Sequence, residues 1–279
     1  MKDFIREKVC FYSSVFKGRF SAFEMLEYAA SRGAKGLELL NFCDELRTPD
    51  MNSAKEIGRR ARELGLVLPC LSVGVDFSIG EYSEKVEMAK RYVDIASELE
   101  IPFFHHTVVF SLTPPDDMKE AARLGLMGAM EICDYARARG IETLVEDQGF
   151  VYNGVDGYRP LIDATDGRIG ALLDVGNSLF VDEDSTEFLS AFSHNIRHVH
   201  IKDFALSDLQ PADGSYYKSL GGKYITDCEV GTGAVDFAKI ATGLKAAGYN
   251  GLYSLEFAGV SGEDEVERVL KRTYEWFGK

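Results

Sequence analysis

A regular alternation of strand-like and helix-like segments along the chain is the feature that most constrains its fold. Short apolar runs are spaced as strands, and each is followed by a segment with helical character. The strand-like runs are residues 9–15, 36–40, 67–73, 103–109, 142–146, 169–174, 196–201 and 251–256. Strands that alternate with helices in this way predict a parallel sheet with helices packed against it.

The clearest helix-like segments are amphipathic stretches between these strands. They are residues 22–32, 53–64, 83–100, 116–139, 236–247 and 263–277. Several are followed by a glycine, as a helix C-terminus commonly is: Gly33, Gly65, Gly140 and Gly248. Residues 156–166 and 185–194 are weaker helix candidates. Residues 205–230 have no regular pattern, and we expect an irregular lid or binding loop there.

Eight strand–helix units in 279 residues predict an α/β fold, a single (β/α)₈ barrel (a TIM barrel) that forms one domain over residues 1–279. A doubly wound open sheet is the alternative. That fold requires a glycine-rich phosphate loop after its first strand, and residues 11–16 read FYSSVF. We therefore expect the barrel.

Charge and cysteine content narrow the class of protein. The formal net charge of −14 argues against a nucleic-acid partner, which normally requires a basic face. No apolar stretch reaches membrane-spanning length, and residues 1–8 carry charges where a signal peptide needs an apolar run. The five cysteines lack CxxC spacing, which indicates reduced thiols rather than disulfides or a thiolate zinc site. We expect a cytoplasmic protein that binds neither nucleic acid nor membrane.

Polar residues stand where the last four predicted strands end: Glu146, Asp174, His200 and Glu256. In a (β/α)₈ barrel these ends meet at the face that carries active sites, and neighbouring strands lie about 4.8 Å apart. A buried carboxylate is costly unless it is neutralised, and three carboxylates with one imidazole suit a divalent metal. A single acidic strand end is usually a helix cap or a surface residue. Four on consecutive strands predict one metal site.

The positions of the polar residues along the strand at 196–201 indicate a different role for each. Alternation places His198, His200 and Lys202 on one face. Because His200 is nearer the strand end, it is the better metal ligand, and His198 is expected to fill the barrel interior. Lys202 is a candidate catalytic residue that stabilises developing negative charge or protonates a leaving oxygen. A salt bridge to Asp203 or Glu146 is its structural alternative.

Four further residues are candidates for contact with a substrate. Glu38 ends the second strand, where it either faces the substrate or forms a salt bridge at the barrel mouth. His105 and His106 end the fourth strand, and alternation along the strand favours His106 as the one that contacts hydroxyl groups. Gln148 and Asn177 are uncharged polar residues placed to recognise hydroxyl groups.

Six segments, taken in order, resemble the xylose isomerase-like superfamily. Within it they are similar to the sugar phosphate isomerase/epimerase family, which includes D-tagatose 3-epimerases and inosose dehydratases. The segments are GLEL at 36–39, LVED at 144–147, LDVGN at 173–177, HVHIKD at 198–203, VGTGAVDF at 230–237 and SLEF at 254–257. The resemblance covers nearly the whole chain. It implies that Glu146, Asp174, His200 and Glu256 hold the metal, that the two glutamates also act as the acid/base pair, and that the protein forms dimers or tetramers.

Two positions depart from the epimerase pattern. The epimerases usually carry a substrate-binding histidine where this chain has Asn177, and an arginine a few residues after the metal histidine, where this chain reads KDFAL at 202–206. These departures favour the branch that contains inosose dehydratases and enzymes that eliminate across keto-sugars. A trinuclear zinc site, as in the AP-endonuclease relatives, needs several more histidines than the five present.

We therefore expect an isomerase or epimerase that removes a proton next to the carbonyl of a free or keto-sugar, through an enediolate held by the metal. One Mn²⁺ is the expected cofactor, with Co²⁺, Mg²⁺ and Zn²⁺ as alternatives. A lyase that acts on a keto-inositol or a 3-keto-glycoside is the alternative reaction. A catalytically silent sugar-binding or subunit protein is a third hypothesis, against which the paired Glu146 and Glu256 argue. No phosphate-binding motif is evident, so an unphosphorylated carbohydrate is favoured.

Overall fold

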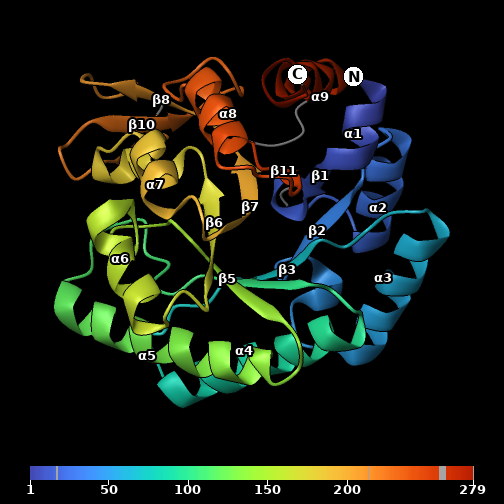
Figure 1. Cartoon of the computed structure of the whole chain (residues 1–279), viewed down its shortest axis with the longest axis horizontal. Coiled ribbons are helices and arrows are strands. Elements are labelled where there is room, and N and C mark those ends of the chain that lie inside the picture. Colours follow the sequence, from blue (N-terminus) through green and yellow to red (C-terminus); the bar gives the residue numbers. More distant parts are fainter. Residues whose placement is uncertain (17, 213, 258–261, 279) are drawn as a thin grey trace.

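The computed structural model describes residues 1–16, 18–212, 214–257 and 262–278, and it contains a closed barrel of parallel strands (Figure 1). Around the barrel the strand order is β1-β11-β7-β6-β5-β4-β3-β2. The strands are β1 (Val9–Tyr12), β2 (Gly36–Leu40), β3 (Cys70–Val73), β4 (Phe103–His106), β5 (Glu142–Glu146), β6 (Gly170–Asp174), β7 (Ile196–Ile201) and β11 (Tyr253–Leu255). The predicted (β/α)₈ fold is confirmed. That residues 1–279 form one domain stays a prediction.

The helices form an outer layer around the barrel (Figure 1). They are α1 (Lys2–Lys8), α2 (Ala22–Ser31), α3 (Met51–Glu63), α4 (Tyr82–Glu98), α5 (Met118–Arg137), α6 (Gly154–Ala164), α7 (Ser185–Phe192), α8 (Phe237–Ala246) and α9 (Glu263–Phe277). Helix α1 precedes the barrel and was not predicted. Among the residues that the structure describes, no helix combines the length and the apolar character needed to span a membrane.

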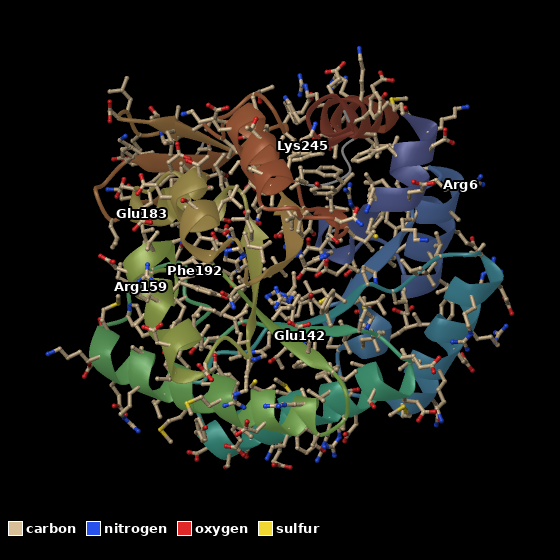
Figure 2. The ribbon with its side chains drawn as sticks, viewed as in Figure 1. Arg6, Glu142, Arg159, Glu183, Phe192 and Lys245 are labelled. Carbon is tan, nitrogen blue, oxygen red and sulfur yellow. The ribbon has the colours of Figure 1, made fainter. Side chains whose placement is uncertain are left out.

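The two segments with weak helical patterns are helices, α6 and α7, and local interactions explain both. The side chains of Asn153 and Asp184 cap their first turns by accepting backbone N–H hydrogen bonds. Helix α6 contains Pro160, which weakens its sequence pattern. Tertiary packing then holds the pair together, and Arg159 of α6 lies 5.4 Å from the ring centre of Phe192 in α7 (Figure 2).

The segment expected to be irregular, residues 205–230, is only partly so. Part of it belongs to a small antiparallel sheet of β8 (Phe204–Ser207), β10 (Tyr224–Asp227) and β9 (Tyr217–Lys218), in the order β8-β10-β9. A role as a lid or binding loop stays a prediction. These strands are two to four residues long, too short for a clear alternating pattern. We call residues 204–212 and 214–227 the flap. Buried Phe204 and Ile225 anchor it against Phe150 and Phe180 of the barrel loops.

Inside the barrel, apolar side chains give way to polar ones toward the carboxyl ends of the strands. Cys70, Leu144 and Leu172 form a buried apolar cluster against Phe103. Each next inward position along β3, β5 and β6 is polar, because inward-facing residues recur every second position. The barrel therefore carries buried titratable groups at the end where the βα loops begin.

Candidate metal centre and pocket

Glu146, Asp174, His200 and Glu256 converge at the carboxyl ends of β5, β6, β7 and β11. One ligand atom from each lies within 4.8 Å of every other. The backbone N–H of Glu256 donates to Ile201, which continues the pairing of β11 with β7 and fixes Glu256 beside His200. The structure thus brings together all four residues expected to hold a metal.

Three of these side chains fit a metal because each leaves a buried polar atom without a hydrogen bond: Asp174 Oδ2, His200 Nδ1 and Glu256 Oε2. His200 Nδ1 lies 2.8 Å from Glu256 Oε2 and 3.6 Å from Glu146 Oε1, yet neither approach is aligned as a hydrogen bond. Adjacent ligands of an octahedral ion bound at about 2.1 Å lie roughly 3 Å apart. The spacing and the oxygen-rich donor set therefore suit one divalent cation.

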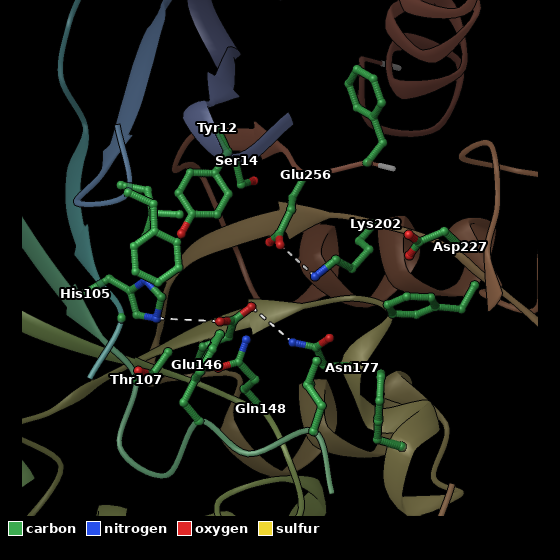
Figure 3. Close-up of a pocket in the computed structure, with 18 of the residues that line it drawn as sticks. Tyr12, Ser14, His105, Thr107, Glu146, Gln148, Asn177, Lys202, Asp227 and Glu256 are labelled. Atoms are coloured by element: carbon green, nitrogen blue, oxygen red, sulfur yellow. Dashed lines mark hydrogen bonds and ion pairs between the residues drawn. The ribbon is translucent and has the colours of Figure 1, made fainter. Parts of the chain in front are cut away.

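The hydrogen bonds around Asp174 direct its second oxygen into the cluster. Asp174 Oδ1 accepts from the backbone N–H groups of Gly176 at 2.8 Å and Asn177 at 3.1 Å. The backbone N–H of Asp174 donates to Asp147 Oδ1 at 2.8 Å. The side-chain amide of Asn177 donates to Glu146 Oε1 at 3.1 Å, so the same turn also positions Glu146 (Figure 3).

Opposite charges meet in this cluster and shift the pKa values of its members. Burial raises the pKa of Asp174 to about 7, although nearby Lys202 opposes the shift. Burial opposes ionisation of Glu256 as well, but Lys202 and His200 outweigh it and lower the pKa of Glu256 to about 2. The pKa of Lys202 is raised, because Asp174, Glu256 and Glu146 outweigh its burial.

Lys202 forms its ion pairs with residues other than those suggested from the sequence. Its Nζ lies 2.7 Å from Glu256 Oε1 (Figure 3). It also lies 3.4 Å from Asp174 Oδ2. Asp203 instead accepts backbone N–H hydrogen bonds from Gly231 and Gly233 at 2.9 and 2.8 Å. Asp203 therefore joins two of the six segments that carried the family resemblance, HVHIKD and VGTGAVDF.

Glu38 is buried beneath the metal cluster and does not line the pocket, contrary to one of its two expected roles. Its Oε2 lies 2.9 Å from His198 Nε2 and 3.0 Å from His200 Nε2. The alternative, a salt bridge at the barrel mouth, differs in place: Glu38 pairs with two histidines in the barrel interior. His198 lies in the barrel interior, as expected. Glu38, His198 and His200 also satisfy the spacing of a metal site. Both imidazoles, however, already form hydrogen bonds with the Glu38 carboxylate.

A pocket of about 290 Å³ opens above the cluster (Figure 3). Five of the predicted site residues line it: Glu146, Gln148, Asn177, Lys202 and Glu256. His106 does not, and the expectation for it is not met. Because Phe103 faces the barrel interior, alternation along β4 sends His105 into the barrel and His106 outward against Phe77 and Phe104. His105 lines the pocket in its place.

Several pocket residues were missed from the sequence. Tyr12 and Ser14 come from the end of β1 and the turn after it, and Asp227 comes from the flap. The polar end of the first strand was a usable signal for Tyr12 and Ser14. Asp227 gave none, because only the folded sheet brings it over the barrel.

The sequence matches the model of a family described as xylose isomerase-like TIM barrel over residues 26–279. The inosose dehydratase of Geobacillus thermodenitrificans (strain NG80-2) is 24% identical over 186 residues, which are 65% of this chain and 59% of that protein. The chain thus spans less than two thirds of the length of this relative.

Two solved structures share the fold. The D-psicose 3-epimerase with D-tagatose from Clostridium cellulolyticum H10 has a TM-score of 0.75 and 14% identity, over 97% of this chain and 99% of that one. A xylose isomerase-like TIM barrel protein from Mycobacterium smegmatis in complex with magnesium has a TM-score of 0.69 and 18% identity, over 91% and 89%. At these identities the likeness shows the fold alone. Since the family match spans most of the sequence and the strands close into the expected barrel, the chain belongs to the xylose isomerase-like TIM barrel family.

Proposed function

We propose that the protein is a divalent-metal-dependent isomerase or epimerase that acts on a free or keto-sugar. One observation carries the proposal: Glu146 and Glu256 face each other across the pocket, and each also offers an oxygen to the four-residue cluster (Figure 3). Two carboxylates on opposite sides of one carbon can remove a proton from one face and return it to the other. Similarity to an inosose dehydratase and a D-psicose 3-epimerase supports a carbohydrate substrate.

Each pocket residue then has a defined task. A divalent ion such as Mn²⁺, held by Glu146, Asp174, His200 and Glu256, supplies Lewis-acid stabilisation of negative charge on a substrate oxygen. Glu256 is ionised at neutral pH, because its pKa is lowered to about 2, and it can accept a proton. Such a weak base suits a C–H bond that a neighbouring carbonyl has already made acidic. Gln148 offers an unpartnered buried Oε1 to a substrate hydroxyl.

Solvent exchange tests this proposal. The protein is incubated in D₂O with Mn²⁺ and a panel of ketoses and keto-inositols, and deuterium at the carbon next to the carbonyl is measured by mass spectrometry and NMR. We expect incorporation that EDTA abolishes and that Glu256→Gln lowers by at least about 10²-fold. Glu142→Gln, at the opposite end of β5, is the matched control and keeps full exchange. No exchange with Mn²⁺, Co²⁺, Mg²⁺ or Zn²⁺ on any sugar contradicts the proposal.

A second candidate, a lyase, is favoured by the position of Lys202. Its Nζ lines the pocket 2.7 Å from Glu256 Oε1, so a cationic proton donor stands beside a proton acceptor. Glu256 can then take the α-proton while Lys202 protonates the oxygen that leaves from the neighbouring carbon. A keto-inositol loses water in this way, and a 3-keto-glycoside loses its aglycone. A product that absorbs in the ultraviolet, lost in Lys202→Met while α-carbon exchange persists, supports the lyase.

Assembly and location rest on the sequence. Dimers or tetramers are expected from the family, and sedimentation of the purified protein tests them. The cytoplasmic location also stays a prediction.

A further inference from the structure

His105 presents an unpartnered nitrogen to the pocket. Its side chain is buried and lines the cavity, and its Nε2 makes no hydrogen bond. The nearest acidic group is Glu146, whose Oε2 lies 3.6 Å from Nε2, beyond hydrogen-bond distance (Figure 3). A buried polar atom left without a partner is costly, so a nitrogen aimed into a cavity indicates a ligand group that meets it.

The protonation of the His105 ring follows from the groups behind it. Ser72 Oγ donates its single hydrogen to Glu38 Oε1 at 2.6 Å. Ser72 Oγ also lies 3.0 Å from His105 Nδ1. Because the hydroxyl hydrogen is already used, Ser72 can only accept from His105, and the ring hydrogen must be on Nδ1. The lone pair of Nε2 then faces the pocket.

Glu38 is the acceptor at the end of this chain of hydrogen bonds. Its Oε2 lies 2.9 Å from His198 Nε2 and 3.0 Å from His200 Nε2, so both imidazoles face one carboxylate oxygen. The other oxygen, Oε1, accepts from Ser72 Oγ. The Ser72 hydrogen is therefore directed at Glu38 and away from His105.

We propose that His105 is a substrate-binding residue whose Nε2 accepts a hydrogen bond from a substrate hydroxyl, and that Ser72 and Glu38 are positioning residues that hold it as an acceptor. The inference deepens the proposed function, on which it rests for the nature of the ligand. His105 Nε2 and Glu146 Oε2 are two acceptors 3.6 Å apart, so neither satisfies the other, and a substrate hydroxyl donates its hydrogen to Nε2. The ligand class is a polyhydroxy ketone with an O–H group beside the carbon that faces Glu146. An analogue deoxygenated there loses roughly 10- to 100-fold in affinity, because His105 Nε2 stays unpaired.

The tautomer can be tested without any ligand. In protein labelled with ¹⁵N-histidine and loaded with diamagnetic Mg²⁺, long-range ¹H–¹⁵N correlation spectra distinguish Nδ1–H from Nε2–H rings. The chain has five histidines, and His105→Gln identifies the signal of interest. We expect Nδ1–H in the wild type, loss of that preference in Ser72→Ala, and its recovery in Ser72→Thr, which restores the hydroxyl. A wild-type His105 that is Nε2–H or doubly protonated overturns the inference.

The ligand is tested with D-tagatose and scyllo-inosose as probes of the Mg²⁺-loaded protein. We expect at least one of them to shift the His105 Nε2 resonance, and Ser72→Ala to weaken its binding roughly 10-fold while Ser72→Thr restores it. No shift with either sugar overturns the acceptor role. A sugar that exchanges deuterium without shifting the His105 Nε2 resonance contradicts this inference but leaves the proposed function intact. A sugar that shifts this resonance without exchanging deuterium supports this inference but contradicts the proposed function.

Discussion

The carboxylate of Glu38 accepts the Nε2 hydrogen of His200 at 3.0 Å, so the other ring nitrogen of His200 turns toward the cluster of carboxylates above it. One imidazole thus connects a buried interior carboxylate to the candidate metal site. Carboxylate–histidine pairs of this kind fix the ring orientation and the tautomer of a metal ligand, and they raise its basicity. Buried residues inside the barrel therefore position a side chain of the candidate metal site, in addition to packing the core.

Glu38→Gln should weaken Mn²⁺ binding roughly 10- to 100-fold, because a neutral amide lacks the negative charge that faces His198 and His200 and raises the basicity of the His200 ring. Isothermal titration calorimetry on the metal-free protein measures the affinity, and circular dichroism confirms that the barrel remains folded. The variant retains all four residues of the proposed metal site.

The matched control for this substitution is Glu142→Gln, which changes a strand glutamate paired with Arg197 and should leave Mn²⁺ affinity unaltered. One bound ion per chain is expected in both variants. If the wild type binds two ions and Glu38→Gln binds one, then Glu38 is a metal ligand and the positioning role is wrong.

Lys202→Met should separate metal binding from turnover. Lys202 Nζ lies 2.7 Å from Glu256 and 3.4 Å from Asp174, so its charge repels an incoming cation. Its removal should tighten Mn²⁺ binding roughly 10-fold, since charges this close interact strongly in a partly buried site. The rate of a lyase reaction should fall by about 10²-fold or more, because the proton donor for the leaving oxygen is lost, whereas exchange at the α-carbon should persist. Lys239→Met, on the outer helix α8, is the control, and equal Mn²⁺ affinity in both variants would contradict the prediction.

The sequence was sufficient to predict the barrel and the convergence of four polar residues, because both depend on local patterns. Strand and helix periods alternate regularly, and the four cluster residues each end a strand whose position was recognisable. The ends of parallel strands in a closed barrel meet at one face, so positions along the strands determine which residues converge. Asp174 and Glu256, for example, converge although 82 residues of sequence separate them, as the numbering shows.

Other features depend on tertiary register, which the sequence does not display. The choice between His105 and His106 turned on which face of β4 points into the barrel, since the predicted strand already began at Phe103 and alternation alone does not say which face is inside. Glu38 appeared to belong to the mouth because it stands near a strand end, yet the histidines of β7 cover it. The flap strands are held by contacts with Phe150 and Phe180, which are distant in sequence.

The flap should loosen when Asp182 is replaced by alanine. Asp182 Oδ1 accepts from Ser219 Oγ at 2.6 Å, and Oδ2 accepts from the backbone N–H of Gly221. Loss of these exposed hydrogen bonds should cost about 1 kcal/mol and increase cleavage within the flap by a protease. Asp182 also has a left-handed backbone, with φ of 59°, which alanine tolerates poorly.

Asp182→Asn is the matched variant for the flap, because asparagine adopts the left-handed conformation readily and retains one acceptor oxygen. It should be cleaved more slowly than Asp182→Ala. Both variants should keep wild-type Mn²⁺ affinity, since Asp182 lies outside the cluster. Identical cleavage of all three proteins would show that Asp182 does not hold the flap.

The pH dependence of metal binding should report on Asp174. The pKa of this carboxyl in the metal-free protein is raised to about 7, so below pH 7 it holds a proton that a metal must displace. In this range the affinity falls as the pH falls, by up to about tenfold per unit for this one proton. The same proton favours the metal-free fold, because the unfolded carboxyl has an ordinary low pKa. That stabilisation is lost as the pH rises through 7.

The pKa of His200 is raised well above its ordinary value, since Glu38, Glu146 and Glu256 outweigh burial. The proton of His200 therefore competes with the metal at pH 6 and at pH 8 alike. Calorimetry in buffers of different ionisation enthalpy should therefore find about one more proton released per Mn²⁺ at pH 6 than at pH 8. Equal proton release at the two pH values would mean that Asp174 is already ionised in the metal-free protein.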